Sequence, residues 1–371
     1  MKQCIGILLG ILAFWAFHMT AEVFAAPEVS AQAAVVMEAG TFDVLFEKNA
    51  YEKRPMASTT KIMTTLLTLE SGGLDEVFPV DSDAIHVEGS SMGLVEGDLV
   101  TKRALCCGML LPSGNDAANA AAVAVAGSIP TFVKQMNDRA AQIGMTHTCF
   151  VTPSGLDGEG HGASAYDMAL LTREALRNAD FRAICCQKAA KVSFGNPPYD
   201  RTLYNSNKLL GMYEGVIGVK TGFTDDAGRC LVSACERDGV TLICVTLHAP
   251  DDWNDHIRLY DAAFAQVEAR TLAVPEGLTM PVAGGSAEQV GLRAAYPLTI
   301  GWRCGQTPDV SAKVQRAPLV CAPVQAGETL GMLVYYRDGR IIGEIPLCAN
   351  QAVPARTRRQ GFREWLQRAL P

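Results

Sequence analysis

The sequence predicts an α+β fold, with one sheet built from both ends of the first 270 residues and helices in between. Strand-like patterns occupy residues 33–47 and 216–247, whereas apolar residues at helical spacing fill much of 58–144. After residue 270, short strand-like runs punctuated by Gly and Pro return. The chain has 371 residues, 49% of them apolar and 19% charged, which suits about two globular domains and excludes a disordered or collagen-like protein.

Residues 1–25 are typical of a secretory signal peptide. Lys2 precedes an uncharged stretch whose apolar centre, Ile5 to Phe17, is thirteen residues long. A helix that spans a bilayer needs about 20 apolar residues, and small residues such as Ala25 follow where a signal peptidase would cut. We therefore expect cleavage and a mature protein that works outside the cytoplasm, attached to the outer face of the plasma membrane by its tail. A retained N-terminal anchor is the alternative.

Residues 26–270 contain the elements of the first predicted domain. Two strand-like segments flank Ala39-Gly40 as a β-hairpin, and Asp238-Gly239 joins two later strands in a tight turn. Serines and glycines at the ends of the apolar stretches predict where the helices start and stop. The expected strands are 33–38, 41–47, 216–220, 229–236 and 240–247. The expected helices are 58–71, two between 104 and 126 that meet at Pro112-Ser113-Gly114, 128–144, one from Ser164, and 255–268, with a loop at 151–163.

Residues 271–350 predict a small all-β domain, either a sandwich or a barrel. The clearest pattern is the pair of runs 330–336 and 341–345, which Asp338-Gly339 joins. No polar side chain in this stretch has an evident catalytic pattern. We therefore interpret it as a spacer or docking module.

Residues 351–371 predict an amphipathic helix that lies on an anionic membrane surface. The net charge of residues 356–371 is +4, whereas that of the whole chain is −7. The rest of the chain therefore has a net charge of −11 and offers no basic surface for nucleic acid. The alternative is that the apolar stripe packs on the protein itself. The stripe residues are Phe362, Trp365, Leu366, Ala369 and Leu370.

The cysteines and histidines predict neither a disulfide framework nor a metal site. Of twelve cysteines, eleven follow the cleavage site, and an odd number cannot pair completely. The adjacent pairs Cys106-Cys107 and Cys185-Cys186 lie in apolar helical stretches, where a free thiol behaves as a small hydrophobe. The histidines lack HxH or HExxH spacing, so we expect no metal and no other cofactor.

Two further polar groups have an open or simple interpretation. His161 lies in a Gly-rich loop, where it could line a cleft or serve a structural role. We interpret Asp251, Asp252 and Asp255 as a solvated turn and helix start.

Three short motifs carry groups suited to acyl transfer. Ser58 and Lys61 stand three residues apart at the start of a helix and therefore share one face. A desolvated lysine can accept the proton of a serine hydroxyl, and the positive end of the helix dipole favours a developing anion. Ser113-Gly114-Asn115 falls at the turn between two helices, and Lys220-Thr221-Gly222 follows a strand. Each motif alone also fits an ordinary capped helix, turn or edge strand.

Together and in this order, the motifs resemble S-x-x-K, S-x-N and K-T-G, the signature of the penicillin-recognising serine enzymes. Residues 30–268 are further similar to the serine-type D-alanyl-D-alanine carboxypeptidases, the low-molecular-mass penicillin-binding proteins. The resemblance implies that residues 26–270 share the fold of serine β-lactamases and DD-peptidases, an antiparallel sheet with a helical subdomain. The β-rich domain and amphipathic tail are also similar to that family's layout. The matching segments are 56–64, 111–119, 144–148, 153–157 and 218–224.

The resemblance implies a role for each site residue. Ser58 would attack the carbonyl between the terminal D-alanines of a peptidoglycan stem peptide, Lys61 would take its proton, and Ser113 would protonate the leaving D-alanine. Backbone N–H groups of Ser58 and Phe223 would form the oxyanion hole, and Lys220 with Thr221 would bind the terminal carboxylate. Some relatives add an Arg where this chain has Ser206, so carboxylate binding here would depend more on Lys220, Thr221 and Thr224. The substrate-binding residues implied are Asn115, Lys220, Thr221, Gly222, Phe223 and Thr224, and β-lactam antibiotics would be inhibitors.

Alternative functions share part of this pattern. A serine β-lactamase has the same three motifs, and residues 174–178 fit the E-x-x-x-N string of class A enzymes. We interpret that fit as chance, because the string lies in a helical pattern and close to Lys220. A transpeptidase or endopeptidase differs only in the acceptor or the bond cut, and a catalytically silent cell-wall-binding module is a non-enzymatic alternative.

Overall fold

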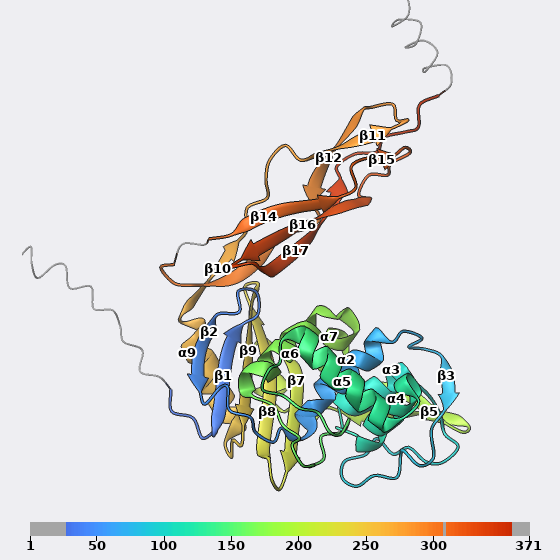
Figure 1. The fold of residues 1–371 in the computed structure, drawn as a ribbon, viewed down its shortest axis with the longest axis vertical. Coiled ribbons are helices and arrows are strands. Elements are labelled where there is room, and N and C mark those ends of the chain that lie inside the picture. The colour runs from blue at the N-terminus through green and yellow to red at the C-terminus, as the bar shows by residue number, and fades with distance from the viewer. Residues whose placement is uncertain (1–26, 307–308, 358–371) are drawn as a thin grey trace, which may run out of the picture.

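Five antiparallel strands form the central sheet of the first domain, in the order β2-β1-β9-β8-β7. Strand β1 pairs along its whole length with β9, so segments from the two ends of the domain lie side by side (Figure 1). Every residue of β1 is buried because both faces of this strand are covered, which explains its nearly continuous apolar sequence. The strands are β1 (Ala33–Glu38), β2 (Val44–Lys48), β7 (Val216–Thr224), β8 (Gly228–Arg237) and β9 (Val240–Leu247).

This computed structural model describes residues 27–306 and 309–357, and its arrangement confirms the predicted α+β fold. The predicted signal peptide lies outside the described residues, as does the tail from residue 358 onward. The predicted start of the amphipathic helix at residue 351 is wrong, because residues 351–357 run along the all-β domain, where Val353 pairs with Val324 and Ala355 with Gly285. Within the described chain, no single helix is long and apolar enough to cross a membrane. The nearest case is the pair Asn115–Ala126 and Ile129–Ile143, which is bent by 86°.

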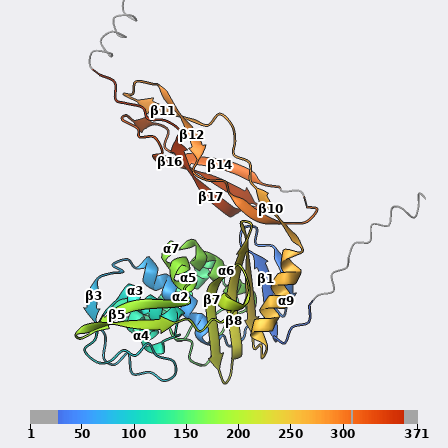
Figure 2. The same cartoon turned by 180° about the vertical axis from the view of Figure 1, so that it is seen from behind.

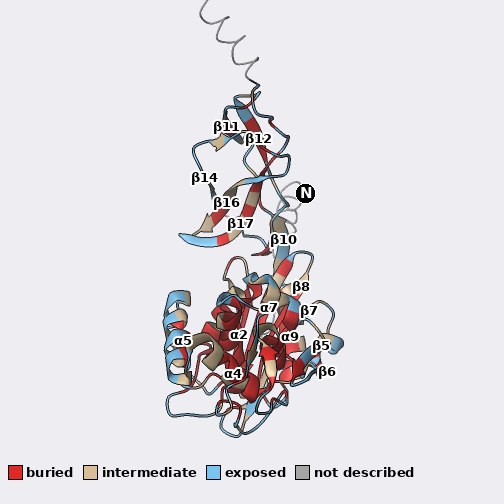
Figure 3. Cartoon of the chain, turned by 90° about the vertical axis from the view of Figure 1, so that its right-hand side faces the viewer, coloured by how far each residue is buried: buried red, intermediate tan, exposed pale blue. Residues whose placement is uncertain are grey.

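Helices cover both faces of the central sheet. Helix α9 (Asp252–Phe264) packs on one face, and a layer centred on α2 (Lys61–Glu70) packs on the other (Figures 1 and 2). Successive side chains of β8 therefore pack against different helices: Val232 contacts the α2 layer, whereas Leu231 contacts the α9 side. Buried residues are therefore concentrated between the helices and the sheet (Figure 3).

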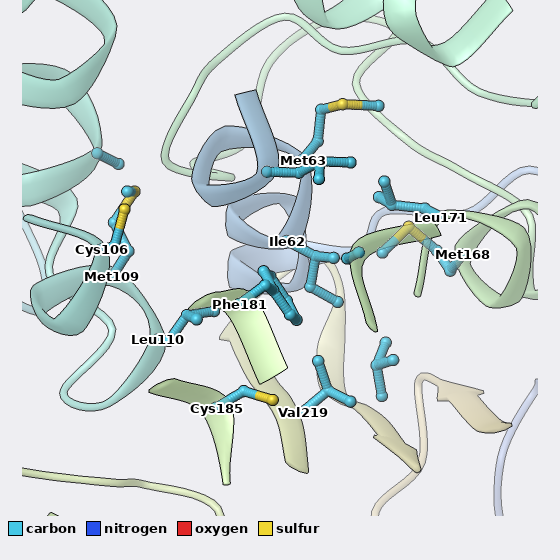
Figure 4. Packing of buried hydrophobic residues seen from close by; sticks show 14 of the residues in the cluster. Ile62, Met63, Cys106, Met109, Leu110, Met168, Leu171, Phe181, Cys185 and Val219 are labelled. Atoms are coloured by element: carbon cyan, nitrogen blue, oxygen red, sulfur yellow. The ribbon is translucent and has the colours of Figure 1, made fainter. Parts of the chain in front are cut away.

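The α2 layer is an apolar core of interlocking helices. Ile62 and Met63 of α2 face a cluster of side chains from several neighbouring elements, including Leu110, Leu171 and Phe181 (Figure 4). A predicted helix over 58–71 is correct except for its first turn, which is the 3-10 helix η1 (Ala57–Thr60). The other helices of this layer are α3 (Lys102–Leu110), α4 (Asn115–Ala126), α5 (Ile129–Ile143), α6 (Ala165–Arg177) and α7 (Ala179–Cys185). The short helix α8 (Leu209–Met212) instead buries Leu209 in the cluster on the α9 side.

Local signals end these elements as the sequence predicts. The Ser128 hydroxyl accepts the Thr131 N–H at the start of α5, and Gly144 ends it in a left-handed conformation with φ of 90°. In the turn between β8 and β9, Asp238 and Gly239 both have positive φ, at 52° and 82°, which is the geometry of a type I′ hairpin.

The closing helix of the domain lies earlier than predicted. Its predicted range was 255–268, but α9 ends at Phe264, and β10 (Val267–Thr271) pairs with β13 (Thr299–Arg303). The local pattern did not reveal the strand because its partner follows about thirty residues later.

The prediction of a solvated acidic turn before α9 is wrong for two of its three residues. Asp252 and Asp255 are almost fully buried. Asp255 accepts the backbone N–H and hydroxyl of Ser30 at 2.9 and 2.7 Å, and Asp252 accepts the Arg229 guanidinium. A buried carboxylate requires such partners, and here they come from distant parts of the chain.

Two small two-stranded sheets were not predicted: β3 (Val77–Pro79) with β4 (Leu99–Thr101), which residues 80–98 connect, and the hairpin of β5 (Ala189–Gly195) with β6 (Pro198–Tyr204). The second contacts the rest of the domain through Arg201. The Arg201 guanidinium lies between the rings of Phe194 and Tyr199, at 3.9 and 4.3 Å, and donates to the Gly93 carbonyl at 2.7 Å.

Residues from β10 onward form the all-β domain, whose own apolar core includes Trp302 and Leu333. Its six-stranded sheet has the order β14-β16-β17-β12-β11-β15, and β10 with β13 forms a separate ribbon. The six strands are β11 (Thr279–Ala283), β12 (Gln289–Ala294), β14 (Ser311–Arg316), β15 (Val320–Cys321), β16 (Thr329–Arg337) and β17 (Arg340–Ala349).

The two domains are stacked end to end and joined by polar contacts (Figure 1). Glu38, at the end of β1, accepts the Gly301 N–H at 3.0 Å, and Asp43 pairs with Arg337 at 2.9 Å. These contacts lie at the end of the sheet that carries Glu38 and the β8–β9 turn. The turn between β7 and β8, which follows the Lys220-Thr221-Gly222 motif, therefore lies at the opposite end, away from the all-β domain.

All eleven cysteines in the described residues are free, as predicted from their positions. Cys106 and Cys107 are buried in the α2 layer and Cys244 in the sheet, whereas Cys186, Cys304 and Cys321 are exposed. Burial raises the pKa of the Cys106 and Cys244 thiols well above the usual range. The buried thiols are thus protonated and act as apolar side chains.

Candidate active site

Ser58 lies in a tight 3-10 turn that strand β7 and the 151–163 loop approach closely. Ala57, immediately before it, has a φ of 47°, which is unfavourable for a residue with a side chain. A Cβ on Gly222 would lie 3.1 Å from the Ser58 nitrogen, and one on Gly155 would lie 2.1 Å from the Ala57 carbonyl oxygen. Gly155 is therefore required by close packing around the Ser58 turn, whereas a side chain at Gly222 would be tight and would need a small shift of the turn.

Lys61 is fully buried and its ammonium nitrogen is surrounded by oxygen atoms. Nζ lies 2.8 Å from Ser58 Oγ, 2.7 Å from Asn115 Oδ1 and 2.6 Å from the Ser154 carbonyl oxygen. Desolvation, and then the charge of Lys220, lowers the pKa of Lys61 well below its usual value. The surroundings of Lys61 therefore favour the neutral amine, which is the form that can accept a proton.

The neutral form of Lys61 leaves one orientation for its lone pair. Asn115 Oδ1 and the Ser154 carbonyl can only accept, so each takes one of the two N–H bonds of a neutral amine. The Asn115 amide orientation is fixed independently, because its Nδ2 donates to the Glu88 carbonyl at 2.6 Å. The lone pair then points to Ser58 Oγ, whose hydroxyl donates to it.

Asn115 and Asp116 attach the 88–95 loop to the start of α4. Asn115 N donates to the Ser90 carbonyl at 2.7 Å. The buried Asp116 carboxylate accepts the backbone N–H groups of Met92 and Leu94 at 2.9 and 3.0 Å. Both side-chain atoms of Asn115 are engaged, so in this structure it positions Lys61 and the loop.

Ser113 and Lys220 form a second hydroxyl–amine pair in the same site. Lys220 Nζ donates to Ser113 Oγ at 2.9 Å and to the Thr221 carbonyl at 2.8 Å. Burial lowers the pKa of Lys220 to about 7, so this amine exchanges protons near neutrality. Ser113 has a φ of 70°, a strained conformation that directs its side chain from the α3–α4 turn toward β7.

A cavity of about 340 Å³ opens beside these pairs. Ser58, Ser113, Thr221 and Gly222 line it, and the Phe223 ring at its edge is 64% exposed. The other lining residues are Ser90, Pro112, Ser206, Lys208, Arg229, Asp252 and Trp253.

The structure brings most of the predicted site residues together. Lys61, Asn115 and Lys220 lie behind the cavity lining but are joined to Ser58 and Ser113 by hydrogen bonds. Thr224 is the exception, since it neither lines the cavity nor joins this network, and its hydroxyl donates to Asp157 at 2.9 Å. Ser206, predicted to lack a charged anchor, has its hydroxyl 2.7 Å from that of Thr221. Three groups of the site were not predicted, namely the Ser154 carbonyl, Asp116 and Arg229. Asp116 and Ser154 lie in the segments 111–119 and 153–157, whose resemblance to the family was the available signal. Arg229 lies outside the matching segments, so no signal pointed to it.

His161 and Glu174 lie outside the reaction centre. Burial lowers the pKa of His161 to about 4, and its ring contacts Thr60 Oγ1 at 2.9 Å and the Val151 N–H at 3.0 Å, which indicates the structural role. Glu174 lies within α6, paired with Arg139, and not on a loop. Over the described ranges, no group of three His, Cys, Asp or Glu side chains is arranged to hold a metal ion.

A serine paired with a buried lysine, a second Ser–Lys pair and a K-T-G edge strand define the class of penicillin-recognising serine acyl-enzymes. The comparisons specify the family. A model described as D-alanyl-D-alanine carboxypeptidase matches residues 20–251, and one described as the C-terminal domain of penicillin-binding protein 5 matches residues 274–355. The chain belongs to the D-alanyl-D-alanine carboxypeptidase family.

Individual relatives agree over nearly the whole chain. D-alanyl-D-alanine carboxypeptidase DacF of Bacillus subtilis is 32% identical, with 92% of this chain and 89% of the relative covered. DacC of Escherichia coli is 31% identical over 94% and 91%. The solved structure of penicillin binding protein 5 from Haemophilus influenzae has a TM-score of 0.63 at 27% identity and covers 89% of this chain and 99% of its own. A DD-transpeptidase of Streptomyces, with a TM-score of 0.62 at 31% identity, covers 65% of this chain and 99% of its own.

The protein is thus a serine-type D-Ala-D-Ala carboxypeptidase that acts on peptidoglycan stem peptides and binds β-lactams. It removes the terminal D-alanine, which is a hydrolytic step of cell-wall biogenesis.

Proposed function

We propose that Ser58 is the nucleophile of this reaction and Lys61 its base. The observation that carries the proposal is the arrangement around Lys61 Nζ, where two obligate acceptors leave the lone pair for Ser58. Ser58 Oγ forms a bond to the carbonyl carbon between the two D-alanines as its proton moves to Lys61. The N–H groups of Ser58 and Phe223 hold the resulting oxyanion.

Ser113 and Lys220 complete the first half of the reaction. The Ser113 hydroxyl protonates the leaving D-alanine nitrogen as the C–N bond breaks, and Lys220 replaces that proton. Thr221 and Lys220 bind the terminal carboxylate, and Gly222 keeps β7 close to the nucleophile. The proton that Lys61 took from Ser58 then returns through solvent to Lys220, so both amines regain their starting protonation. Lys61 deprotonates the water that attacks the ester, and it returns this proton to Ser58 Oγ as the ester C–O bond breaks. The product is a stem peptide that is one residue shorter.

The test uses full-length protein and the Ser58→Ala variant, each incubated with benzylpenicillin and with diacetyl-Lys-D-Ala-D-Ala. We expect a long-lived penicilloyl adduct on Ser58 together with release of D-alanine, and neither in Ser58→Ala. Rapid penicillin turnover without peptide cleavage would instead indicate a β-lactamase, and neither activity would indicate a silent wall-binding module. Added glycine as an acceptor would reveal transpeptidation by the mass of the product.

We further propose that the protein acts outside the cytoplasm and is attached to the membrane by the tail after residue 357. The apolar stripe and arginines of the tail support this, as does the end of the described chain on the all-β domain, far from the catalytic domain (Figure 1). Flotation with anionic and with neutral liposomes would compare the full chain with one ending at residue 357, which keeps Val353 in the core of the all-β domain. Equal binding of the two would contradict the proposal.

A further inference from the structure

The cavity beside Ser58 has one cation that the rest of the protein holds in place. Its charged lining residues are Lys208, Arg229 and Asp252. Arg229, near the start of β8, pairs directly with Phe223 on β7, while Thr221 pairs with Leu231. Arg229 and Thr221 are therefore diagonal neighbours on the same face of the sheet, within reach of a long side chain.

Asp252 fixes the orientation of the Arg229 guanidinium. Asp252 Oδ1 accepts Nε at 3.1 Å and Nη2 at 2.6 Å, and this carboxylate is only 3% exposed. The Trp253 ring lies 5.5 Å from the guanidinium carbon. The Arg229 side chain itself is 42% exposed and lines the cavity. Its hydrogen bonds to Asp252 use Nε and Nη2, so Nη1 of a held guanidinium remains for a ligand.

The other groups near the cavity leave a need for a further carboxylate anchor. Thr224 is engaged with Asp157, and Lys220 is shared between the carboxylate, Ser113 and the Thr221 carbonyl. Lys208 is exposed, and its ammonium group has no partner among the described residues. Binding a ligand would therefore cost Lys208 more side-chain entropy than it would cost Arg229. A guanidinium that is already held gives a charge-assisted hydrogen bond without that cost.

We propose that Arg229 anchors the free carboxylate at the leaving end of the substrate, beside the hydroxyls of Thr221 and Ser206. This inference rests on the proposed function of the cavity. Arg229 then determines specificity, because it favours a peptide that ends in a carboxylate over one whose last residue is amidated or extended.

The experiment compares diacetyl-Lys-D-Ala-D-Ala with its C-terminal amide, which lacks only the charge. In full-length protein, Arg229→Gln is expected to lower kcat/KM for the free acid by about 10- to 100-fold, the value of a hydrogen bond to a charged group. For the amide the change should be less than about threefold. Lys208→Gln removes an equal charge from the same cavity and should change the acid-to-amide ratio by less than about threefold.

Two additional variants separate this role from folding and from catalysis. Arg229→Gln combined with Asp252→Asn leaves no unpaired buried carboxylate and should show the same loss of preference. In the Ser58→Ala background, calorimetric binding of the acid and the amide measures the preference without turnover. Lack of D-alanine release by the native protein would contradict the proposed function, while the Ser58→Ala binding series would still test Arg229.

Equal losses for acid and amide, an unchanged ratio in Arg229→Gln, or a loss of preference in Lys208→Gln would each overturn the assignment.

Discussion

Gly155 offers the sharpest test of how the site is held, because one added methyl group reaches the Ser58 turn. A Cβ there would lie 2.1 Å from the Ala57 carbonyl oxygen and 2.9 Å from Thr60 Oγ1, so the turn or the loop must move by about 1 Å. Gly155 also has a φ of 88°, which costs a residue with a side chain about 1–2 kcal/mol. With about 1–3 kcal/mol for overpacking, Gly155→Ala should lose about 2–5 kcal/mol of stability.

The catalytic effect should be larger than the stability loss suggests. The shift would displace both the Ser58 backbone and the Ser154 carbonyl that holds Lys61, and a misplacement of about 1 Å can cost about 100-fold in rate. Gly160→Ala is the matched control, since Gly160 has a similar φ of 79° in the same loop but nothing within 4 Å of an added Cβ. It should lose about 1–2 kcal/mol and acylate normally.

The assay is the rate of penicilloyl-adduct formation by mass spectrometry, at a temperature where urea titration shows each variant folded. If Gly155→Ala acylated at the rate of Gly160→Ala, the contact between the loop and the nucleophile turn would not control the reaction.

Three further predictions concern titration and support of the site. The pKa of Lys220 is about 7 in the folded protein and about 10.4 in the unfolded chain. Between these values the unfolded chain binds more protons, so the free energy of unfolding rises with pH. Lys220→Met should remove a slope of up to about 1.4 kcal/mol per pH unit, measured by urea titration at pH 7 to 9. His161 has a pKa of about 4 in the folded protein instead of 6.5, so stability should fall as the pH drops from 6.5 to 4. The melting temperature of His161→Gln should fall less over this pH range. An identical fall in both proteins would show that His161 does not cause the pH dependence. Arg201→Ala removes the hydrogen bond to the Gly93 carbonyl and should slow acylation by about tenfold. Tyr204→Ala, an exposed change in the same hairpin, should leave the acylation rate unchanged. If the two variants acylated at the same rate, the hairpin would not support the active site.

Local sequence patterns predicted those parts of the fold whose causes are local. The Asp238-Gly239 turn, the Ser128 and Gly144 ends of α5 and the strand carrying Lys220 all follow from the residues at those positions. The hairpin of β5 and β6 was not predicted although β5 alternates, with Ala190, Val192 and Phe194 more buried than the residues between them. Its partner β6 is mostly exposed and offers no such pattern.

The motif residues of the site were predictable, but the groups that support them were not. Ser154 acts through its carbonyl, so its side-chain type carries no signal. Arg229 and Asp252 are 23 residues apart and meet only because β8 and α9 pack together. The burial of Asp255 likewise depends on Ser30, from the other end of the domain. Such pairs require the tertiary structure.

The free thiols give this protein a set of internal unfolding reporters. An alkylating reagent can reach Cys186, Cys304 and Cys321 in the native state, whereas Cys106 and Cys244 react only after their layers open. Cys348, buried in the all-β domain, reports on that domain separately. Timed alkylation followed by peptide mapping would therefore resolve which domain opens first, without any introduced label.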